Sequence, residues 1–197
     1  MMLWTTTDDK TLAQIAKVIA AGGVVLLPTD TIYGLHASAA DEEAVRRIRL
    51  MKGRDADKPF VVIAGSVEQV RELGAVVPKV LHQIWPAPVT AVLRRREGTV
   101  AVRIPDLAWL RDLLQRTGPL VSTSANHSGE PPVDSPDQLA DDLRAALDGV
   151  LDLTAEKGAA KAKASAIVDF TESSPRVIRE GEALFTQKLR KTLRKTL

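Results

Sequence analysis

The sequence predicts an α/β domain in which a twisted, mixed parallel and antiparallel sheet is flanked by helices. Short apolar runs alternate along the chain with segments that carry apolar residues at helical spacing, which is the pattern of interleaved strands and helices. Two apolar runs are separated only by residues 94–98 and are therefore expected to pair as an antiparallel hairpin. Because strands joined through helices are commonly parallel, the sheet should contain both orientations.

In the first half of the chain, glycines mark the expected helix ends. Leu12, Ile15 and Ile19 form one helical face, which Gly22 and Gly23 bring to an end. The elements expected here are a helix over 11–21, a buried strand over 24–27, a loop over 28–34, a helix between Asp41 and Gly53, a strand over 60–63, and short helices after Ser66 and Pro78.

In the second half, prolines and one soft segment interrupt the pattern. Pro86 and Pro88 exclude regular structure between them, so the chain is expected to turn there. Residues 154–163 are rich in alanine, glycine and lysine, and we expect a mobile loop. The other expected elements are strands over 89–93 and 99–104, a helix over 106–116, a strand over 119–121, a helix from Ser135 carrying Leu139, Leu143 and Leu147, and strands over 166–170 and 176–178.

Size and composition favour one folded domain. The chain has 197 residues, of which 45% are hydrophobic and 26% are charged, so it can bury one core and is far from disordered or membrane compositions. No apolar stretch approaches the roughly 20 residues that span a bilayer, and the first ten residues lack the pattern of a secretory leader. We therefore expect a cytoplasmic protein.

Missing residue types exclude several kinds of chemistry. The chain has no cysteine and three histidines, His36, His82 and His127, so zinc ligation and thiol catalysis have no support and no metal site is expected. The histidines have no recognisable partner in the sequence, and we assign them no role. Phosphate-loop, GxGxxG, GxSxG and HExxH motifs are absent, which argues against dehydrogenases and hydrolases of those types.

Positive charge is concentrated at the end of the chain. The formal net charge is +2, but residues 1–187 contain 22 basic and 25 acidic residues, because five cations and no acid follow. We therefore divide the chain into a main domain over 1–184 and a basic amphipathic tail over 185–197, expected to be a solvated or partly frayed helix. Deleting 186–197 should then leave catalysis intact, and weak binding of RNA phosphates is the other interpretation of the tail.

Three segments at predicted strand or helix ends are rich in hydroxyls, amides and cations: 28–34, 52–58 and 122–129. Binding sites in α/β proteins are commonly found at such ends. Lys52 and Arg54 flank a glycine that lets the backbone turn, so both charges are able to converge on one phosphate chain. Compensation of the helix dipole explains cations at a helix end equally well.

Two further features also have a functional and a structural interpretation. The run from Ser122 to Asn126 offers neutral donors and acceptors that suit phosphate or ribose oxygens, but an ordinary Ser/Thr turn is the simpler interpretation. Arg103 interrupts an apolar strand, so its charge should lie beside a carboxylate or a phosphate. A structural salt bridge is the alternative to a ligand contact.

The order of these segments is more specific than any one of them. They read PTDTIYGL (28–35), KGR (52–54) with KP (58–59), WPAPVT (85–90), TVAVRIP (99–105), STSANHSG (122–129), and Ser165 with VD (168–169) and REG (179–181). In this order they resemble the YrdC/TsaC family, the threonylcarbamoyl-AMP synthases, over roughly residues 10–182.

The resemblance implies a fold, a reaction and substrates. The family has a single α/β domain whose twisted mixed sheet forms a concave cleft for ATP and threonine. Threonine and bicarbonate give N-carboxy-threonine, whose carboxylate attacks the α-phosphorus of ATP and releases pyrophosphate. A partner enzyme then transfers the threonylcarbamoyl group to the tRNA adenosine beside the anticodon. Mg²⁺ is expected on the ATP phosphates, without a protein carboxylate cage.

The resemblance also assigns site residues. Both reactants are anionic, so cations and hydroxyls that neutralise and align them suffice without a general base. The residues expected to bind ATP are Lys52, Arg54, Lys58, Thr99, Ser124, Asn126 and Arg179. The residues expected to bind threonine are Thr31, Arg103, Ser122 and Ser165, with Arg103 on the carboxylate.

The chain departs from the family pattern at four positions, none of which removes a cation. His36 and Ala87 stand where glycine is common, Ala166 replaces a threonine, and Ile63 occupies a place where many members have histidine. The change at Ile63 bears on the details of the threonine contacts. The chain resembles the short form of the family, without the second domain of the longer members.

Two other functions compete with this one. Related domains in hydrogenase-maturation proteins form a carbamoyl adenylate, but those domains are embedded in longer chains with zinc-finger and acylphosphatase modules. A non-catalytic RNA-binding protein is the second rival, because the tail and the cationic loops would both attract phosphates in a salt-sensitive, sequence-blind manner.

Overall fold

The structure, a computed structural model, describes residues 1–55, 58–157 and 163–196. Ten strands within these ranges belong to one sheet. They are β1 (Met2–Trp4), β2 (Val25–Pro28), β3 (Tyr33–Ser38), β4 (Val61–Ile63), β5 (Val89–Arg94), β6 (Thr99–Arg103), β7 (Leu120–Ser124), β8 (Gly149–Leu151), β9 (Ala166–Asp169) and β10 (Arg176–Arg179).

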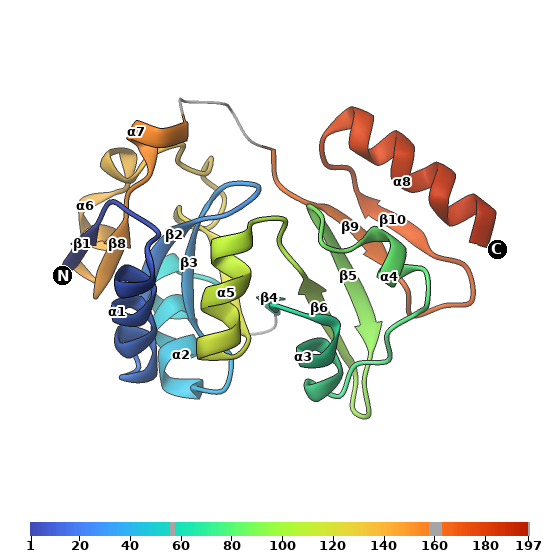
Figure 1. The fold of residues 1–197 in the computed structure, drawn as a ribbon, viewed down its shortest axis with the longest axis horizontal. Helices are drawn as coiled ribbons and strands as arrows, with labels where there is room; N and C mark the ends of the chain where they lie inside the picture. Colours follow the sequence, from blue (N-terminus) through green and yellow to red (C-terminus); the bar gives the residue numbers. More distant parts are fainter. Residues whose placement is uncertain (56–57, 158–162, 197) are drawn as a thin grey trace.

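The sheet is mixed, as the sequence predicts. Its strand order is β1-β8-β2-β3-β7-β4-β6-β5-β9-β10 (Figure 1). The pairs β1–β8, β2–β8, β4–β6 and β5–β9 are parallel. The pairs β2–β3, β3–β7, β4–β7, β5–β6 and β9–β10 are antiparallel. The predicted hairpin is the antiparallel pair of β5 and β6.

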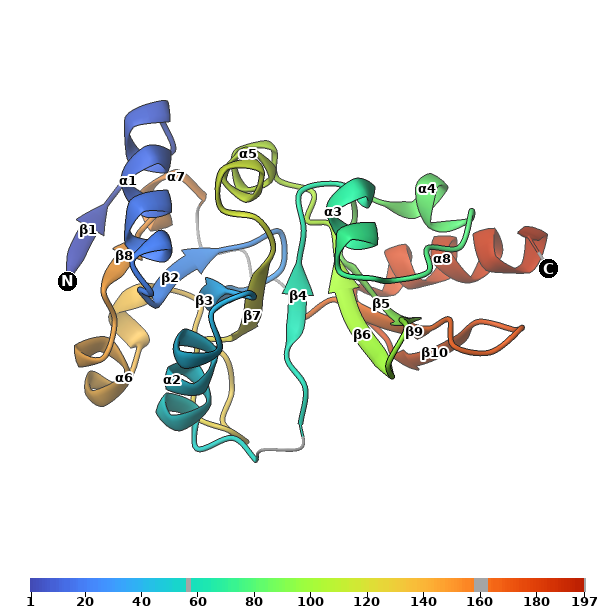
Figure 2. The ribbon, with the colours of Figure 1, turned by 90° about the horizontal axis from the view of Figure 1, so that it is seen from below.

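Helices cover the sheet in three groups, each over an apolar cluster of its own. Around β2, α1 (Asp9–Ala20) and α5 (Ala108–Thr117) cover one face, and α2 (Glu42–Lys52) and α6 (Asp141–Ala145) cover the other (Figure 2). The third group packs on β5, β6 and β9 and consists of α3 (Val67–Glu72), α4 (Leu81–Ile84) and α8 (Ala183–Thr196). Within the described residues, no helix combines the length and the apolar character needed to cross a membrane.

One face of the strands β5, β6 and β9 is only partly covered. Residues along β9, and from Ala91 to Arg94 on β5, alternate between burial and partial exposure, which is the period of two expected when a sheet packs on one face only. Toward α3, α4 and α8 lie the buried residues Ala91, Val102 and Val168. Toward the other face lie the half-buried residues Val92, Ala101 and Ile167.

Local signals placed most helices correctly. Helix α1 begins two residues earlier than expected because the Asp8 side chain accepts the backbone N–H of Thr11 at 2.8 Å. Helix α2 lies between Asp41 and Gly53 as predicted, and Gly53 takes the left-handed conformation (φ 57°) that ends helices and that glycine adopts without strain. The helices after Ser66 and Pro78 are also present.

Three strands are not predicted by the sequence. Strand β3 begins at Tyr33, inside the segment expected to be a loop, although Tyr33, Leu35 and Ala37 alternate with Gly34, His36 and Ser38 at the period of a strand. Strands β1 and β8 have only three residues each, too short for a periodic signal. All three depend on pairing with strands distant in sequence, as in the parallel ladder between β1 and β8.

The segment after β7 also differs from the prediction. The helix expected from Ser135 divides into a short 3₁₀ turn (Pro136–Gln138) and α6, because Leu139 between them is extended (φ −68°, ψ 135°). All three of its predicted core leucines are nevertheless buried. Of the expected mobile loop over 154–163, residues Thr154–Lys157 form the short helix α7, whereas 158–162 lie outside the described residues.

The C-terminal segment is part of the packed structure. Helix α8 buries Leu189 and Leu193, which are 3% and 6% exposed, in the apolar cluster shared with α3, α4, β5 and β9. Thr186 is also buried, and its N–H donates to the Glu182 carbonyl at 2.9 Å. The expectation of a solvated or frayed tail is therefore wrong, because the apolar stripe has a core to cover.

The packing of α8 predicts that the C-terminal segment contributes to stability. Replacing Leu189 with alanine should lower the free energy of unfolding by about 2–5 kcal/mol, the range for a buried leucine that leaves a cavity. Gln187→Ala, an exposed site on the same helix, should change it by less than about 0.5 kcal/mol. Urea unfolding of both variants checks this, and equal midpoints would contradict the packing described above.

Candidate active site

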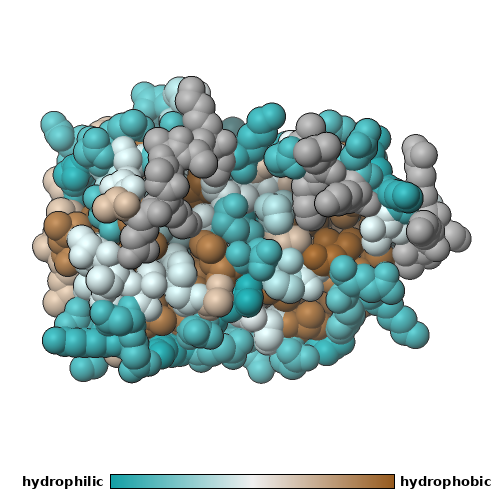
Figure 3. All heavy atoms as spheres, turned by 45° about the horizontal axis from the view of Figure 1, so that its top comes forward, coloured by the Kyte–Doolittle hydropathy of each residue, from teal (hydrophilic) through white to brown (hydrophobic). Residues whose placement is uncertain are grey.

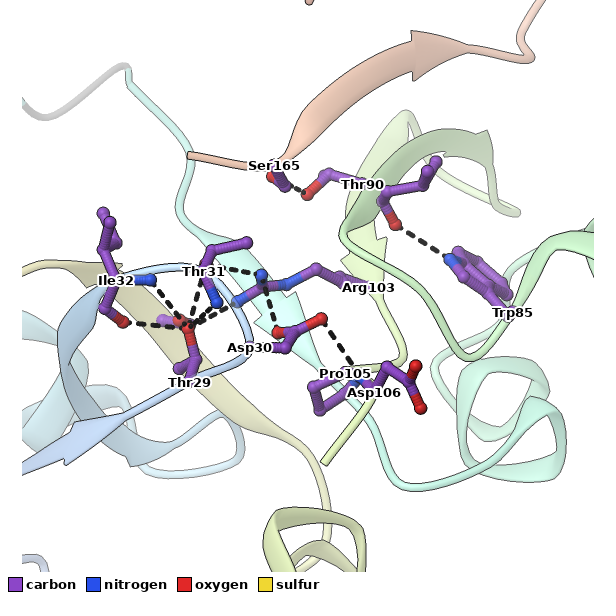
Figure 4. A network of polar contacts seen from close by, with 12 residues as sticks. Thr29, Asp30, Thr31, Ile32, Trp85, Thr90, Arg103, Pro105, Asp106 and Ser165 are labelled. Carbon is purple, nitrogen blue, oxygen red and sulfur yellow. Dashed lines mark hydrogen bonds and ion pairs between the residues drawn. The ribbon is translucent and has the colours of Figure 1, made fainter. Parts of the chain in front are cut away.

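Arg103, at the end of β6, is the centre of a buried polar group. It is 4% exposed, and its Nη1 donates to Thr31 Oγ1 at 2.7 Å and pairs with Asp30 Oδ1 at 3.0 Å (Figure 4). Its Nη2 donates to Thr29 Oγ1 at 3.4 Å. Asp30 Oδ2 accepts the backbone N–H of Asp106 at 3.0 Å. The loop after β2 is thereby tied to the end of β6.

The charge of Arg103 is balanced inside the protein, but one of its donors is unused. Burial lowers the pKa of Arg103, the Asp30 carboxylate raises it, and the positive charge of Arg179 lowers it. The pair with Asp30 is the salt bridge that the sequence offered as the alternative to a ligand contact. Among the described residues, Arg103 Nε has no hydrogen-bond partner. Because an unsatisfied buried donor is unfavourable, an acceptor atom of a ligand would stabilise this arrangement.

Ser165 and Arg179 reach the same end of the site from the strands beyond β5. Thr90 Oγ1 and Ser165 Oγ are buried and 2.8 Å apart. Arg179 donates to the Ser165 carbonyl from Nε at 3.1 Å and from Nη2 at 2.9 Å. In the register of β5 and β6, Thr90 lies opposite Arg103. On its other side Thr90 pairs with Ile167 of β9, and Ile167 pairs with Arg179 of β10. Side chains of paired residues lie on the same face of a sheet, so these residues share a face. Arg179 therefore lies with the predicted threonine residues.

Lys52 holds the segment that follows β7. Its side chain is buried, and Nζ donates to the Ser124 carbonyl at 2.6 Å, to the Asn126 carbonyl over a short contact, and to Asn126 Oδ1 at 3.4 Å. An ammonium group has three N–H donors, and here all three are directed at this segment. Burial and the nearby charge of Arg54 lower the pKa of Lys52 to about 8. These contacts occupy the donors of Lys52, so the geometry shows it holding this segment and leaves the phosphate contact expected from the sequence as a prediction.

Arg54 and Lys58 differ from Lys52 in their exposure. Arg54 lies over the Phe60 ring at 5.2 Å, and donates from Nε to the Lys58 carbonyl at 3.3 Å and from Nη2 to the Pro59 carbonyl at 3.0 Å. Lys58 forms an exposed ion pair with Asp55 at 2.7 Å. Both cations therefore lie at the entry to β4, where a ligand in solution has access to them.

Strand register relates the Arg103 group to the residues at the other end of β6 and β7 on one face of the sheet. Ser122 on β7 and Ala101 on β6 pair with the same residue of β4, so they share a face. Ser124 and Thr99 lie two residues away on the same face, at the end where β4 and β6 begin. Arg103 lies at the opposite end of β6, about 13 Å from Thr99 at about 3.3 Å per residue. The partly covered face thus has polar groups at both ends.

A cavity of about 740 Å³ adjoins the Arg103 group at the loop after β2. Its lining includes no lysine or arginine, so the cations predicted to bind phosphates lie outside it. In Figure 3, hydrophobic and weakly polar residues occupy much of the middle of the view, with hydrophilic residues around them. The cavity is lined by residues 28–33, Pro88, Asp106, Leu107, Val133, Asp134, Ser135, Asp137, Gln138, Leu153 and Thr154.

Sequence reasoning missed four residues that contact the predicted ones. Thr29 and Asp30 bind Arg103, and both stand inside the PTDTIYGL segment, so their position was available as a signal. Thr90 closes the WPAPVT segment and contacts Ser165. His36, to which no role was assigned, lies 3.1 Å from Ser122 through its Nε2. Only the pairing of β3 with β7 reveals that contact.

The fold defines an α/β protein in which one mixed sheet carries a buried arginine group at the end of β6. The chain belongs to the Sua5/YciO/YrdC family, whose model, described as "Telomere recombination", matches residues 17–181. This range contains every residue assigned to the site above.

Curated relatives are named for one activity. The threonylcarbamoyl-AMP synthase of Pyrococcus abyssi is 35% identical over 183 residues, which is 84% of this chain and 52% of that protein. The Bacillus subtilis protein of the same name is 32% identical over 163 residues, 75% of this chain and 47% of that protein. The chain therefore spans about half the length of these two relatives.

A solved structure has the same fold. The crystal structure of P. abyssi Sua5 complexed with L-threonine superimposes with a TM-score of 0.85 at 31% identity, and covers 97% of this chain and 60% of that one. This agreement confirms the predicted α/β fold with a mixed sheet.

The contacts of Lys52 predict that its side chain contributes to stability, whereas the exposed side chain of Lys58 should not contribute. Lys52→Met removes three donors and leaves their acceptors unpaired, so the free energy of unfolding should fall by about 2–3 kcal/mol, the range for hydrogen bonds to a charged group. Lys58→Met removes one exposed ion pair and should change it by less than about 0.5 kcal/mol. Denaturant unfolding at neutral pH measures the stability of both variants. A loss of equal size in the two would argue against the role of Lys52 in holding the segment after β7.

Proposed function

We propose that this chain is an L-threonylcarbamoyladenylate synthase, a nucleotidyltransferase that condenses L-threonine, bicarbonate and ATP into threonylcarbamoyl-AMP and pyrophosphate. The product would supply the threonylcarbamoyl group for the tRNA adenosine next to the anticodon. The observation that carries the proposal is the buried Arg103 group, in which a guanidinium lies beside the hydroxyls of Thr29 and Thr31 at the end of β6. The names of the family relatives agree with this reaction.

The proposed reaction joins two anions. The carboxylate of N-carboxy-threonine forms a new bond to the α-phosphorus of ATP, and the bond from that phosphorus to the pyrophosphate oxygen breaks. Repulsion between the reactants has to be offset and their approach aligned, which positioned cations and hydrogen-bond donors achieve without a general base. Cations on separate strands around one face meet this need.

The amino acid would bind at the Arg103 end. Asp30 and Thr29 hold the guanidinium, so its unpaired Nε is directed by contacts that do not depend on the ligand. A carboxylate is the acceptor that matches a guanidinium donor. The hydroxyls of Thr31, Ser122 and Ser165 supply neutral contacts, and the threonine complex of the family relative supports threonine as the amino acid.

The nucleotide would bind toward the other end of the face, as MgATP. Arg54 and Lys58 would neutralise the leaving pyrophosphate, while Thr99, Ser124 and Asn126 would bind phosphate or ribose oxygens. Lys52 would fix the shape of the Ser124–Asn126 segment. Arg179, which lies beside Ser165, would act where the new carboxylate meets the α-phosphate. Mg²⁺ would arrive on the phosphates, since it keeps several waters when it binds with a nucleotide.

Partners and cellular place stay predictions. A threonylcarbamoyl transferase would consume the adenylate, because such mixed anhydrides are short-lived in water and need an acceptor nearby. Weak direct binding of tRNA through the basic residues of α8 and a cytoplasmic location are both consistent with that role.

Two rival functions predict different products. A carbamoyl-adenylate synthase of the hydrogenase-maturation type would use carbamoyl phosphate in place of threonine and bicarbonate. A non-catalytic RNA-binding protein would release no pyrophosphate at all.

An amino-acid panel tests the proposed function. Purified protein with MgATP and bicarbonate should release pyrophosphate when L-threonine is added and form a product with the mass of threonylcarbamoyl-AMP. Serine and valine should be poorer substrates, because each lacks one group of threonine that the site contacts, by roughly 10–200-fold for a missing methyl group. Pyrophosphate release that depends on carbamoyl phosphate instead, or on no added substrate, would overturn the proposal.

Two arginine variants should affect different substrates. Arg54→Ala should lower kcat/KM for ATP by about 10²–10³-fold, the range for losing one preorganised contact to developing charge. Arg103→Lys keeps a charge beside Asp30 but loses the planar fork, so KM for threonine should rise by about 10–100-fold.

The exposed Arg46, which pairs with Glu43 at 2.6 Å on the outer side of α2, provides the control for both variants. Arg46→Ala should retain wild-type kinetics. If Arg54→Ala behaves like Arg46→Ala, Arg54 has no place at the phosphates. If Arg103→Lys changes the KM for ATP and not that for threonine, the two ends of the site are assigned in the wrong order.

A further inference from the structure

His36 is a fully buried histidine that the proposed chemistry does not use. It lies on β3 with no exposed surface, directly opposite Ser122 on β7. Its Nε2 is 3.1 Å from Ser122 Oγ, and its Nδ1 has no hydrogen-bond partner among the described residues. Ser122 is 9% exposed and is one of the residues expected to bind threonine. The histidine therefore supports a site residue from behind.

The chain makes room for this ring at a neighbouring glycine. A Cβ atom on Gly34 would come within 2.8 Å of His36 Cε1 and within 2.9 Å of the Thr123 carbonyl oxygen. Real Cβ atoms essentially never approach so closely, so His36 lies against the bare backbone of Gly34. The ring is thus held in place by backbone on one side and by Ser122 at its tip.

The surroundings decide the protonation of His36. Burial lowers its pKa to about 3, and the charge of Arg103 acts in the same direction against the opposing effect of the Gly34 backbone. The ring is therefore neutral at any working pH and carries one N–H. With this proton on Nε2, the ring donates to Ser122 Oγ and leaves Nδ1, which has no hydrogen-bond partner among the described residues, as the free lone pair.

This tautomer fixes the role of Ser122. When His36 Nε2–H donates to Ser122 Oγ, one acceptor site of the hydroxyl is occupied and its own hydrogen stays available. A hydroxyl in that state donates, and the group it suits best is an anionic oxygen. Ser122 pairs with Val61 and Arg103 pairs with Ile63, so the two side chains lie on the same face of the sheet, two residues apart along β4.

We propose that His36 is a positioning residue that makes Ser122 a committed hydrogen-bond donor to an anionic group of the bound amino acid. This inference rests on the proposed function, because it takes the amino-acid site to be at Ser122. It adds a residue of this chain for which sequence motifs gave no role. It also explains a specificity: ligands that present an acceptor oxygen to Ser122 are favoured over those that present a donor.

Three variants separate this role from a merely structural one. His36→Leu keeps an apolar side chain in the space but removes the N–H, and should raise the KM for threonine by about 10-fold, the size of one hydrogen bond to a charged group. The KM for ATP should change by less than about 2-fold, since His36 lies away from Arg54 and Lys58. His36→Gln, which restores an N–H donor, should recover most of the threonine affinity.

A double variant tests whether the effect passes through Ser122. His36→Leu combined with Ser122→Ala should be no worse for threonine than Ser122→Ala alone, because residues that act through one contact are not additive. Thermal midpoints of all variants establish that they fold. Additive losses in folded variants, or equal increases in the KM for threonine and for ATP, would overturn the proposal.

A measurement without substrate keeps this test independent of the proposed function. ¹⁵N NMR of the histidine rings in the wild-type protein reports which nitrogen carries the proton. The proposal expects His36 to be neutral and protonated at Nε2 across neutral pH, and a proton at Nδ1 would overturn it. Absence of threonine-dependent turnover in the wild-type protein, together with the expected NMR result, would refute the proposed function and leave the His36–Ser122 bond intact.

Discussion

A buried arginine has to be neutralised, and the arrangement that neutralises Arg103 organises the centre of this protein. Its ion pair with Asp30 draws the loop after β2 across to the end of β6. Breaking such a pair leaves an uncompensated buried charge, which costs about 3–5 kcal/mol, so the loop is strongly held. Among the described residues, Arg103 Nε has no hydrogen-bond partner.

Lys52, Arg54 and Lys58 also differ from one another in burial and in contacts. Lys52 is buried and uses its donors on the segment after β7, while Arg54 and Lys58 are accessible to solvent. A buried cation serves best as a fixed structural contact, because its partners must already be present in the folded protein. Accessible cations are able to exchange water for phosphate.

Sequence patterns succeeded where the signal is local. Asp41 and Gly53 delimit α2 because an N-cap and a left-handed C-cap act within one turn of the chain. Sequence patterns failed where strand pairing determines the structure. An example is β3, whose residues form a strand between β2 and β7. The tail was misjudged for a related reason. Its apolar stripe was visible, but the core that Leu189 covers is built from other parts of the chain.

The sequence by itself determined the mixed α/β class, the order of the motif segments and the set of cations and hydroxyls available to the site. Tertiary structure alone decided which of them meet: Arg179 with Ser165, and His36 with Ser122. The physical reason is that hydrophobic spacing and capping are read over a few neighbouring residues. Contacts between side chains on strands far apart in sequence depend on register, which only the folded sheet fixes.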